Sequence, residues 1–319
     1  MIRGGGSAEN DNMEMTLDSQ AVFTDRGNCI NCGSADLAEI ARGRFSEPPL
    51  VDFINADPWN ECPSPYLREA EWIFAGCRQC GQAFHRRILN GEWNDRRFST
   101  WMNEAAIRDF ESMAGHLSPA KRFQRGRTFV EHILRLEKLT RRIRSNEPVR
   151  LLDFGCGFGE FLAACSVFGF DCSGVDRSTA RRDGAVVPIF SSFEELNDAK
   201  PFHVICLFEV LEHLDDPREL LAKLATKMVS GGILILETPN CSGVTGISSL
   251  DDYRKIHPLD HINAFTRETL TSIAERTGFR GVRSSPAHVT EDRKRILKQE
   301  AKHLLRRDFR ETQLYFQKN

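Results

Sequence analysis

The sequence predicts an α/β protein whose main domain is a Rossmann-like, doubly wound sheet of seven strands with helices on both faces. The first observation is the apolar run VRLLDF, which begins at Val149 and is followed by Gly155, Gly157 and Gly159. A continuous apolar run is typical of a buried parallel strand, and glycines at its carboxyl end let a ligand approach the backbone. The second observation is that strand-like and helix-like segments alternate after this point, which is the pattern of a parallel sheet.

Ahead of this domain, composition divides the chain into three parts. Residues 1–27 are rich in Gly, Ser, Asn, Asp and Glu, and we expect them to be disordered. Residues 28–90 contain paired cysteines and predict a zinc ribbon. Residues 91–146 repeat their apolar side chains at helical spacing, with Ser118 as an N-cap before a first-turn proline, and predict a helical linker. The large domain then occupies residues 147–319.

The paired cysteines form two Cys-x-x-Cys-Gly motifs, CINCG and CRQCG. Each motif makes a turn that aims two thiolates at one point, with its glycine in the left-handed conformation. Two such turns supply a closed tetrahedral site for a structural Zn²⁺ through Cys29, Cys32, Cys77 and Cys80. The stretch between the motifs is expected to fold as a hairpin insert. Two further ligand candidates rank below these four: Cys62 and His85.

The pattern of apolar residues in the large domain predicts five strands separated by helices: LLDF, FDCSGVD, VVPIF, FHVICLF and GGILILET. The amphipathic helix TRETLTSIAERTGF follows and ends at Gly278. The segment FRGVRSS is a sixth candidate strand, residues 291–307 form a basic helix, and QLYFQ is a final strand that we expect to be antiparallel.

Composition excludes some partners. With 40% hydrophobic residues, 28% charged residues and a formal charge of −2, the chain has no global attraction for nucleic acid, so polyanion binding would need a local patch. No stretch approaches ~18 apolar residues, and the first residues lack a signal-peptide core. We therefore expect a cytoplasmic protein without a membrane partner. The oligomeric state stays open.

The end of the second strand indicates the ligand class. Asp176 lies about twenty residues after the glycine turn, where doubly wound folds place a carboxylate on a ribose diol. The ligand could be a dinucleotide or S-adenosylmethionine. A dinucleotide site is typified by G-x-G-x-x-G, whereas this turn is G-x-G-x-G followed by Glu160. The spacing favours S-adenosylmethionine.

A second cluster follows the fourth strand. Glu209, Glu212 and His213 stand at the predicted carboxyl edge of the sheet, and His261 in HPLDHINAF could join them from a later loop. If the chain turns into a helix here, the carboxylates and imidazoles can converge on a hard cation such as Mg²⁺. Metal binding or catalysis and a purely structural role both remain open from the residues alone.

Five segments in order, LLDFGCGFGEFL, GVDRS, FHVICLFEVLEHLDDP, GGILILETPN and HINAFTRETLTSIAERTGF, resemble the class I S-adenosylmethionine-dependent methyltransferases over residues 149–286. Within that superfamily the chain is most similar to the ubiquinone-biosynthesis type of O-methyltransferase. The resemblance implies that Ser191, Ser192 or Phe193 lies beside adenine. It implies this set of cofactor-binding residues: Asp153, Gly155, Cys156, Gly157, Gly159, Asp176, Arg177, Ser192, Phe208 and Glu209.

The same resemblance implies a chemistry. Similar E-x-x-E-H motifs bind Mg²⁺ in ubiquinone O-methyltransferases, and small-RNA 2′-O-methyltransferases add a later D-H, which Asp260 and His261 could match. The expected catalytic set is Glu209, Glu212, His213 and His261, with a histidine as base. O-methylation of a small molecule or sugar is the first expectation. The alternatives are an RNA 3′-terminal 2′-O-methyltransferase and a non-catalytic zinc-ribbon interaction protein with a degenerate fold.

Two positions depart from the family pattern. His203 stands where the family usually has Asp at the start of the fourth strand, and the segment VVPIF-SSF lacks the usual acidic residue near adenine.

Overall fold

The protein is described from a computed structural model, which covers residues 20–113, 118–143, 147–177, 185–196, 199–284, 286–305 and 312–319. Most of the N-terminal segment expected to be disordered, residues 1–19, lies outside the described residues. In the described part of the chain, no helix is long and apolar enough to cross a membrane.

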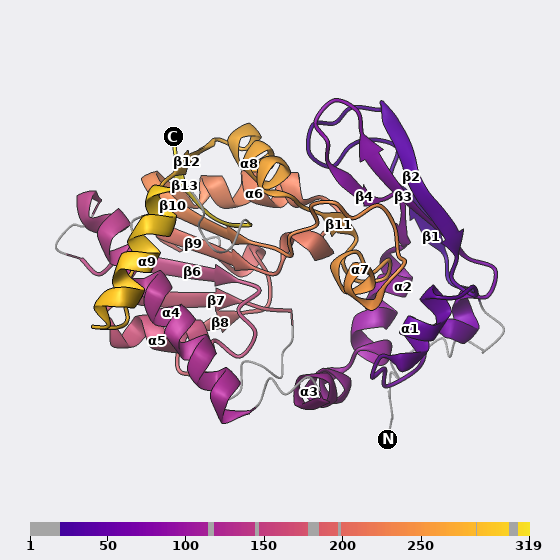
Figure 1. The fold of residues 1–319 in the computed structure, drawn as a ribbon, viewed down its shortest axis with the longest axis horizontal. Coiled ribbons are helices and arrows are strands. Elements are labelled where there is room, and N and C mark those ends of the chain that lie inside the picture. The colour runs from indigo at the N-terminus through magenta and orange to yellow at the C-terminus, as the bar shows by residue number, and fades with distance from the viewer. Residues whose placement is uncertain are drawn as a thin grey trace, which may run out of the picture.

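A seven-stranded mixed sheet forms the main domain, as the sequence predicted (Figure 1). Its strand order is β12-β13-β10-β9-β6-β7-β8, with β13 antiparallel to both neighbours. The central strands are continuous apolar runs because helices cover both of their faces. The strands are β6 (Arg150–Phe154), β7 (Asp171–Val175), β8 (Ile189–Phe190), β9 (Phe202–Phe208), β10 (Met228–Glu237), β12 (Phe279–Val282) and β13 (Gln313–Lys318).

Helices pack on both faces of this sheet (Figure 1). On one face, α4 (Pro119–Leu139) and α5 (Glu160–Val167) bury Ile133, Leu136 and Phe161 against the strands. On the other face, α6 (Pro217–Thr226) and α8 (Arg267–Arg276) bury Leu221 and Leu270. The helix α9 (Arg293–Leu304) lies beside α4 and buries none of its own residues. Short helical turns occur at η3 (Thr140–Arg142), η5 (Glu194–Leu196) and η6 (Leu211–His213).

The N-terminal module is a four-stranded antiparallel sheet of order β11-β4-β3-β2 with a separate two-stranded ribbon, β1-β5. The insert between the cysteine motifs folds as two long strands joined by short helices. Residues 23–25, which the sequence placed in the disordered terminus, instead pair with β5. The elements are β1 (Phe23–Asp25), β2 (Leu37–Arg44), α1 (Leu50–Ala56), η1 (Ser64–Leu67), β3 (Glu71–Cys77), β4 (Ala83–His85) and β5 (Arg87–Leu89).

The main domain completes this module. After β10 the chain crosses to the module, forms α7 (Leu250–Lys255), and adds β11 (Asn263–Ala264) to the edge of β4. Tyr253, Ile256 and Leu259 are buried in the same hydrophobic cluster as the module's own aromatic residues. The N-terminal module therefore shares its hydrophobic core with residues 241–264, because its own two sheets are too small to bury enough apolar surface alone.

The helices expected to form a linker belong to two different cores. They are α2 (Gly91–Arg96), the π-helical turn η2 (Arg97–Trp101), α3 (Glu104–Met113) and α4. Trp93 and Trp101 are buried in the N-terminal module, whereas Ile133 and Leu136 are buried against the large sheet. The first half of residues 91–146 thus belongs to the N-terminal module, and the second half begins the main domain.

Buried polar contacts fix the joint between the two parts. Arg26 donates to the Asn263 side chain at 2.8 Å and to the Ile262 carbonyl at 2.9 Å. The Asn263 amide in turn donates to the carbonyls of Leu211 and Leu214, at 2.8 and 2.7 Å. Because Asn263 is buried, losing these hydrogen bonds would leave its amide desolvated without compensation. The N-terminal module is therefore held directly against the loop that follows β9.

Candidate active site

The glycine turn between β6 and α5 leaves space for a ligand. Gly155, Gly157 and Gly159 all adopt positive φ angles, at 78°, 56° and 73°. A Cβ atom at Gly157 would meet nothing within 4 Å, whereas one at Gly155 would approach Val210 Cγ2 to 2.6 Å. Gly155 is therefore required for packing against the loop after β9, and Gly157 for its backbone angle beside an open space.

Two carboxylates stand behind this turn. Asp176 is buried at the end of β7, and one of its oxygens accepts a hydrogen bond from the Gly157 amide at 2.9 Å. Asp153 is also buried, and its Oδ1 has no hydrogen-bond partner among the described residues. Burial raises the pKa of Asp153 to about 8, and the nearby Asp176 charge adds to the shift. The turn is thus backed by acidic groups that a ligand with hydroxyl or amino donors would satisfy.

The other predicted cofactor residues lie around the same edge of the sheet. Ser192 and Phe193 follow β8, whose Phe190 carbonyl accepts from the Asp176 amide at 2.9 Å. Phe208 ends β9, and its ring lies edge-on to Phe161 at 5.2 Å.

Two more of the predicted cofactor residues, Cys156 and Arg177, make contacts with other parts of the protein. Cys156 is half-buried against Gly174. Arg177 pairs with Asp95 at 3.0 Å and lies over the Phe98 ring at 4.6 Å, so it reaches the N-terminal helices.

The E-x-x-E-H segment adjoins the glycine turn because β6 and β9 are neighbours. Glu209 adopts a φ of 55°, which non-glycine residues rarely take and which costs about 1–3 kcal/mol. Val210 then packs on Gly155, and η6 places Glu212 and His213 in a single helical turn. Backbone strain of this size commonly occurs at functional sites, where the surrounding structure holds it.

Glu212, His213 and His261 come together, with one ligand atom from each lying within 4.8 Å of the others. The imidazole rings of His213 and His261 are 4.8 Å apart in an edge-to-face arrangement. Glu212 is buried, and neither of its oxygens has a hydrogen-bond partner among the described residues. Glu209 lies outside this group of ligand atoms, although its charge acts on Glu212.

Asp260 orients this group. Its Oδ1 lies 3.1 Å from His213 Nδ1 and accepts a hydrogen bond from the Arg97 guanidinium. The Arg97 side chain is only 2% exposed, so it requires a charged partner. The arrangement leaves His213 Nε2 on the side of Glu212 Oε1, at 4.0 Å.

The ionisation states follow from these contacts. Burial would lower the pKa of His213, but Asp260 outweighs it and raises that pKa to about 9. Burial lowers the pKa of His261 to about 4, so this imidazole is neutral at pH 7. Burial also raises the pKa of Glu212 well above its usual range. Burial therefore favours the protonated form of Glu212 when no cation is bound beside it.

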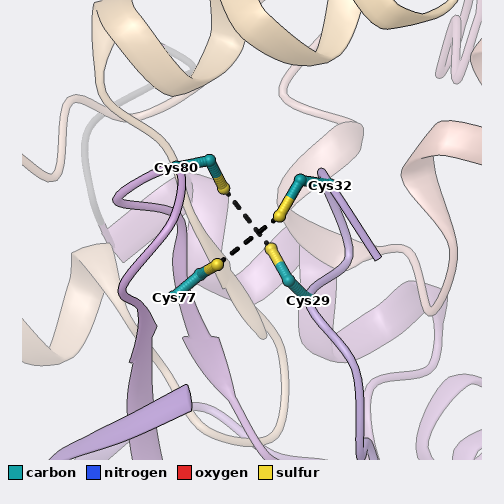
Figure 2. A group of neighbouring side chains, drawn as sticks. All are labelled: Cys29, Cys32, Cys77 and Cys80. Atoms are coloured by element: carbon teal, nitrogen blue, oxygen red, sulfur yellow. Dashed lines mark hydrogen bonds between the residues drawn. The ribbon is translucent and has the colours of Figure 1, made fainter. Parts of the chain in front are cut away.

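The four paired cysteines form a separate cluster, of which Cys29 and Cys77 are buried in the same hydrophobic core as Leu270 of the main domain. Figure 2 shows their side chains pointing toward one another, and all four Sγ atoms lie within 4.8 Å. The pairs Cys29–Cys80 and Cys32–Cys77 each have Sγ atoms 3.5 Å apart. Gly33 and Gly81, which follow the two pairs, have φ angles of 78° and 75°. Of the lower-ranked candidates, Cys62 is exposed and bonded to Asn55.

A family model described as a methyltransferase domain matches residues 123–284, just over half of the chain. The chain belongs to this methyltransferase domain family. Membership confirms the prediction of a methyltransferase domain. The matched residues run from α4 to the end of β12 and include both the glycine turn and the cluster of Glu212, His213 and His261.

Curated relatives and solved structures are similar to parts of this methyltransferase. A ubiquinone biosynthesis O-methyltransferase of Rickettsia bellii is 26% identical over 115 residues, which cover 33% of this chain and 48% of the relative. The corresponding protein of Caulobacter sp. strain K31 is 35% identical over 106 residues, 30% of this chain and 42% of the relative. The chain thus spans about half the length of the curated relatives it matches.

Among solved structures, the plantazolicin methyltransferase BpumL is 18% identical with a TM-score of 0.45, over 71% of this chain and 95% of that one. A SAM-dependent methyltransferase from Archaeoglobus fulgidus is 24% identical with a TM-score of 0.38, over 59% and 99%.

Sequence reasoning missed Arg97, and it noted Asp260 only through the resemblance. Arg97 lies in a segment that read as an amphipathic helix, where an arginine is normally exposed. Its neighbour Phe98 is also notable, since the Arg97 and Arg177 guanidinium groups lie over its ring at 4.1 and 4.6 Å. No local sequence signal distinguishes such a residue, because its partner is 163 residues away.

His85 generates a prediction about acid stability. It is fully buried, and its Nε2 lies 2.7 Å from the Ile256 carbonyl. Burial lowers its pKa from 6.5 to about 3, so the unfolded chain binds a proton that the folded chain excludes. Stability contributed by His85 is complete above pH 6.5 and is lost as pH falls toward 3, by about 1.4 kcal/mol per pH unit. Replacement His85→Gln should therefore flatten the fall in unfolding free energy between pH 6.5 and 5, measured by denaturant titration.

Above pH 7 the parent and His85→Gln proteins should show the same pH slope, because the imidazole is neutral in both states of the parent there. Identical slopes between pH 6.5 and 5 would contradict the assignment of His85 as an acid-sensitive group.

Proposed function

We propose that this methyltransferase transfers the methyl group of S-adenosylmethionine to a hydroxyl group of a small molecule or sugar. The observation that carries the proposal is the group Glu212, His213 and His261 beside the glycine turn. Methyl transfer removes the positive charge of the sulfonium, so the site needs an acceptor held in line and freed of its proton. A cluster of a carboxylate and two imidazoles is suited to both tasks.

The glycine turn is proposed to receive the methionine part of the donor, and Asp176 the ribose. The open space beside Gly157 and the unpaired Oδ1 of Asp153 support this placement. Ser192 and Phe193, at the end of the neighbouring strand, are proposed to lie beside adenine. Arg177 and Phe98 approach from the adjacent side and are placed to shield the donor from water.

The cluster also fits a divalent cation. Glu212 has two buried oxygens without partners, and His261 Nδ1 is likewise buried and unpaired among the described residues. His213 shares its Nδ1 with Asp260, which is how metal-binding histidines are usually oriented. One carboxylate and two imidazoles suit Mn²⁺ or another transition metal better than Mg²⁺, which prefers oxygen ligands. Bound there, the cation would lower the pKa of an acceptor hydroxyl.

Without a cation, His213 and His261 have different roles. Asp260 keeps His213 protonated, so His213 stabilises negative charge and does not remove a proton. His261 is neutral at pH 7 and is the candidate general base. Glu209, at the start of the loop after β9, is proposed to act electrostatically on His213 and His261. Arg97 acts through Asp260 and is a positioning residue.

An RNA 3′ end would use the same cluster, but the formal charge of −2 offers no general attraction for a long polyanion. A non-catalytic role would not explain the strained backbone of Glu209 or the buried, unpaired carboxyl group of Glu212.

The acceptor cluster is tested with labelled S-adenosylmethionine and extracts of small metabolites. The parent protein should transfer label to oxygen, and Glu212→Gln or His261→Ala should reduce that transfer about a hundredfold or more, because positioning or proton removal is lost. Calorimetric titration of the chelator-treated protein with Mn²⁺ tests the metal separately, and Glu212→Gln should weaken binding at least about tenfold.

Glu219→Gln, which removes an exposed carboxylate on α6, is the matched control and should match the parent in both assays. Label found on nitrogen or carbon would refute O-methylation. Parent-like transfer by both cluster variants would remove this group from the chemistry, and no Mn²⁺ binding by the parent would remove the metal alone.

The donor site is tested with Asp176→Ala. Loss of a charge-assisted hydrogen bond to the ribose should weaken S-adenosylmethionine binding roughly ten- to a hundredfold in calorimetry. Asp171→Ala, at the opposite end of the same strand, is the control and should bind as the parent does. Unchanged affinity in Asp176→Ala, or tighter binding of NAD by the parent, would exclude this donor site.

We also propose that Cys29, Cys32, Cys77 and Cys80 hold one structural Zn²⁺. A tetrahedral zinc with bonds of about 2.3 Å places its sulfurs about 3.8 Å apart, close to the 3.5 Å between each facing pair. Asn31, between the first two cysteines, donates to the Thr269 carbonyl on α8 at 3.0 Å. The metal would thereby fix one end of the joint between the module and the main domain.

Metal analysis checks this assignment. The purified parent should contain one zinc per chain, and Cys77→Ser/Cys80→Ser should lose it and unfold at a lower temperature, since the module has little core of its own. Cys62→Ser, which changes an exposed cysteine outside the cluster, should keep both zinc and thermal stability. Stoichiometric zinc in the double variant would refute the proposed ligands.

A further inference from the structure

A basic groove lies on the flank of the main domain, between α4, α9 and the strands β12 and β13. Its volume is about 1050 Å³. Seven arginine and lysine side chains line it, whereas Glu131 is the sole carboxylate among its described lining residues. Glu131 pairs with Arg127 at 3.2 Å, so its charge is already matched. The groove is strongly cationic although the whole chain carries a formal charge of −2.

The helix α9 turns its charged side toward this groove. Arg295, Lys298 and Lys302 line the cavity at the spacing of one helical face. Leu297 and Leu304 are instead 68% and 77% exposed. Arg295 and Lys298 are also exposed, so neither their face of α9 nor the face that carries the leucines is buried. The α9 cations therefore line the groove while remaining accessible to an anion from solution.

The opposite walls add cations from other elements. Arg127 and Arg135 face the groove from α4, Arg267 from the start of α8, and Arg283 from the end of β12. Charges of one sign brought together in a concave site repel one another and focus a positive potential. An anion bound there would relieve that repulsion, and arginine forks match phosphate oxygens two at a time.

The groove opens toward the edge of the sheet that carries the candidate active site. Gln313, on its floor, pairs in register with Glu237 at the carboxyl end of β10, beside the end of β9. On the α4 wall, Arg125 follows the lining residue Gln124 and pairs with Glu160 at 3.3 Å, directly after the glycine turn. A ligand in the groove would therefore lie at the same edge of the sheet as the proposed donor site.

We propose that this groove binds the phosphate groups of a diphosphate-bearing small-molecule acceptor; the inference rests on the proposed function and names its substrate class. Arg127 pairs with Glu131 and Arg295 with Asp292, and cations from four elements line the groove. The volume of about 1050 Å³ is at the upper limit of small-ligand sites, which span roughly 300–1,000 Å³. The phosphates anchor one end of the acceptor, and its hydroxyl reaches toward Glu212, His213 and His261.

The experiment uses inorganic pyrophosphate as the probe, in calorimetric titrations of the full-length protein. The parent should bind pyrophosphate, and Lys298→Gln/Lys302→Gln should bind it roughly ten- to a hundredfold more weakly, because two charge-assisted contacts are lost. The matched control is Arg293→Gln/Lys294→Gln, which removes two exposed charges from the same helix outside the groove. It should bind as the parent does.

S-adenosylmethionine affinity, measured on the same proteins, separates this inference from the proposed function. It should be unchanged in Lys298→Gln/Lys302→Gln, which also shows that the variant is folded, while Asp176→Ala should lose S-adenosylmethionine and keep pyrophosphate. No pyrophosphate binding by the parent, or equal weakening in the control, would overturn the groove assignment even if the donor site binds normally. Single-stranded RNA that binds more tightly than pyrophosphate and displaces it would also overturn it, in favour of a nucleic-acid acceptor.

Discussion

The buried ion pair between Arg97 and Asp260 is the constraint on which the site depends. Arg97 is almost completely buried, and a buried guanidinium without a matched carboxylate would destabilise the fold by about 3–5 kcal/mol. Asp260 supplies the charge and also holds His213 Nδ1. One carboxylate thus joins the N-terminal helices, the loop after β9 and the loop before β11. The orientation of His213 cannot be separated from the docking of the N-terminal module.

This dependence gives the cysteine module a role beyond its own stability. The module shares a hydrophobic core with residues 241–264, and β11 extends its sheet immediately after His261. Asn263 connects the same strand to the carbonyls of Leu211 and Leu214 on either side of His213. A proposed zinc that fixes one end of the module would therefore act on the active-site loop through packing, although it lies outside the chemistry.

The proposed donor site and the basic groove place two electrostatic environments at one edge of the sheet. The buried Asp176 and Asp153 stand behind the glycine turn, where the donor would be received, and the raised pKa of Asp153 favours its neutral form. Cations instead line the groove between α4 and α9, so a phosphate-bearing acceptor would be attracted to the groove and not to the donor site.

The sequence by itself determined the parts of this protein that depend on contiguous residues. The run from Val149 to Gly159 specifies a buried strand and a turn that needs left-handed angles, and the alternating segments after it predicted a doubly wound sheet of seven strands, which the structure confirms. Only the tertiary structure decided which distant groups meet. Arg97 and Asp260 are 163 residues apart, and β11 joins a sheet built from the other end of the chain. The groove formed by the cations of α9 was equally hidden, because a helical pattern shows which residues share a face but not whether that face meets solvent, core or a cavity.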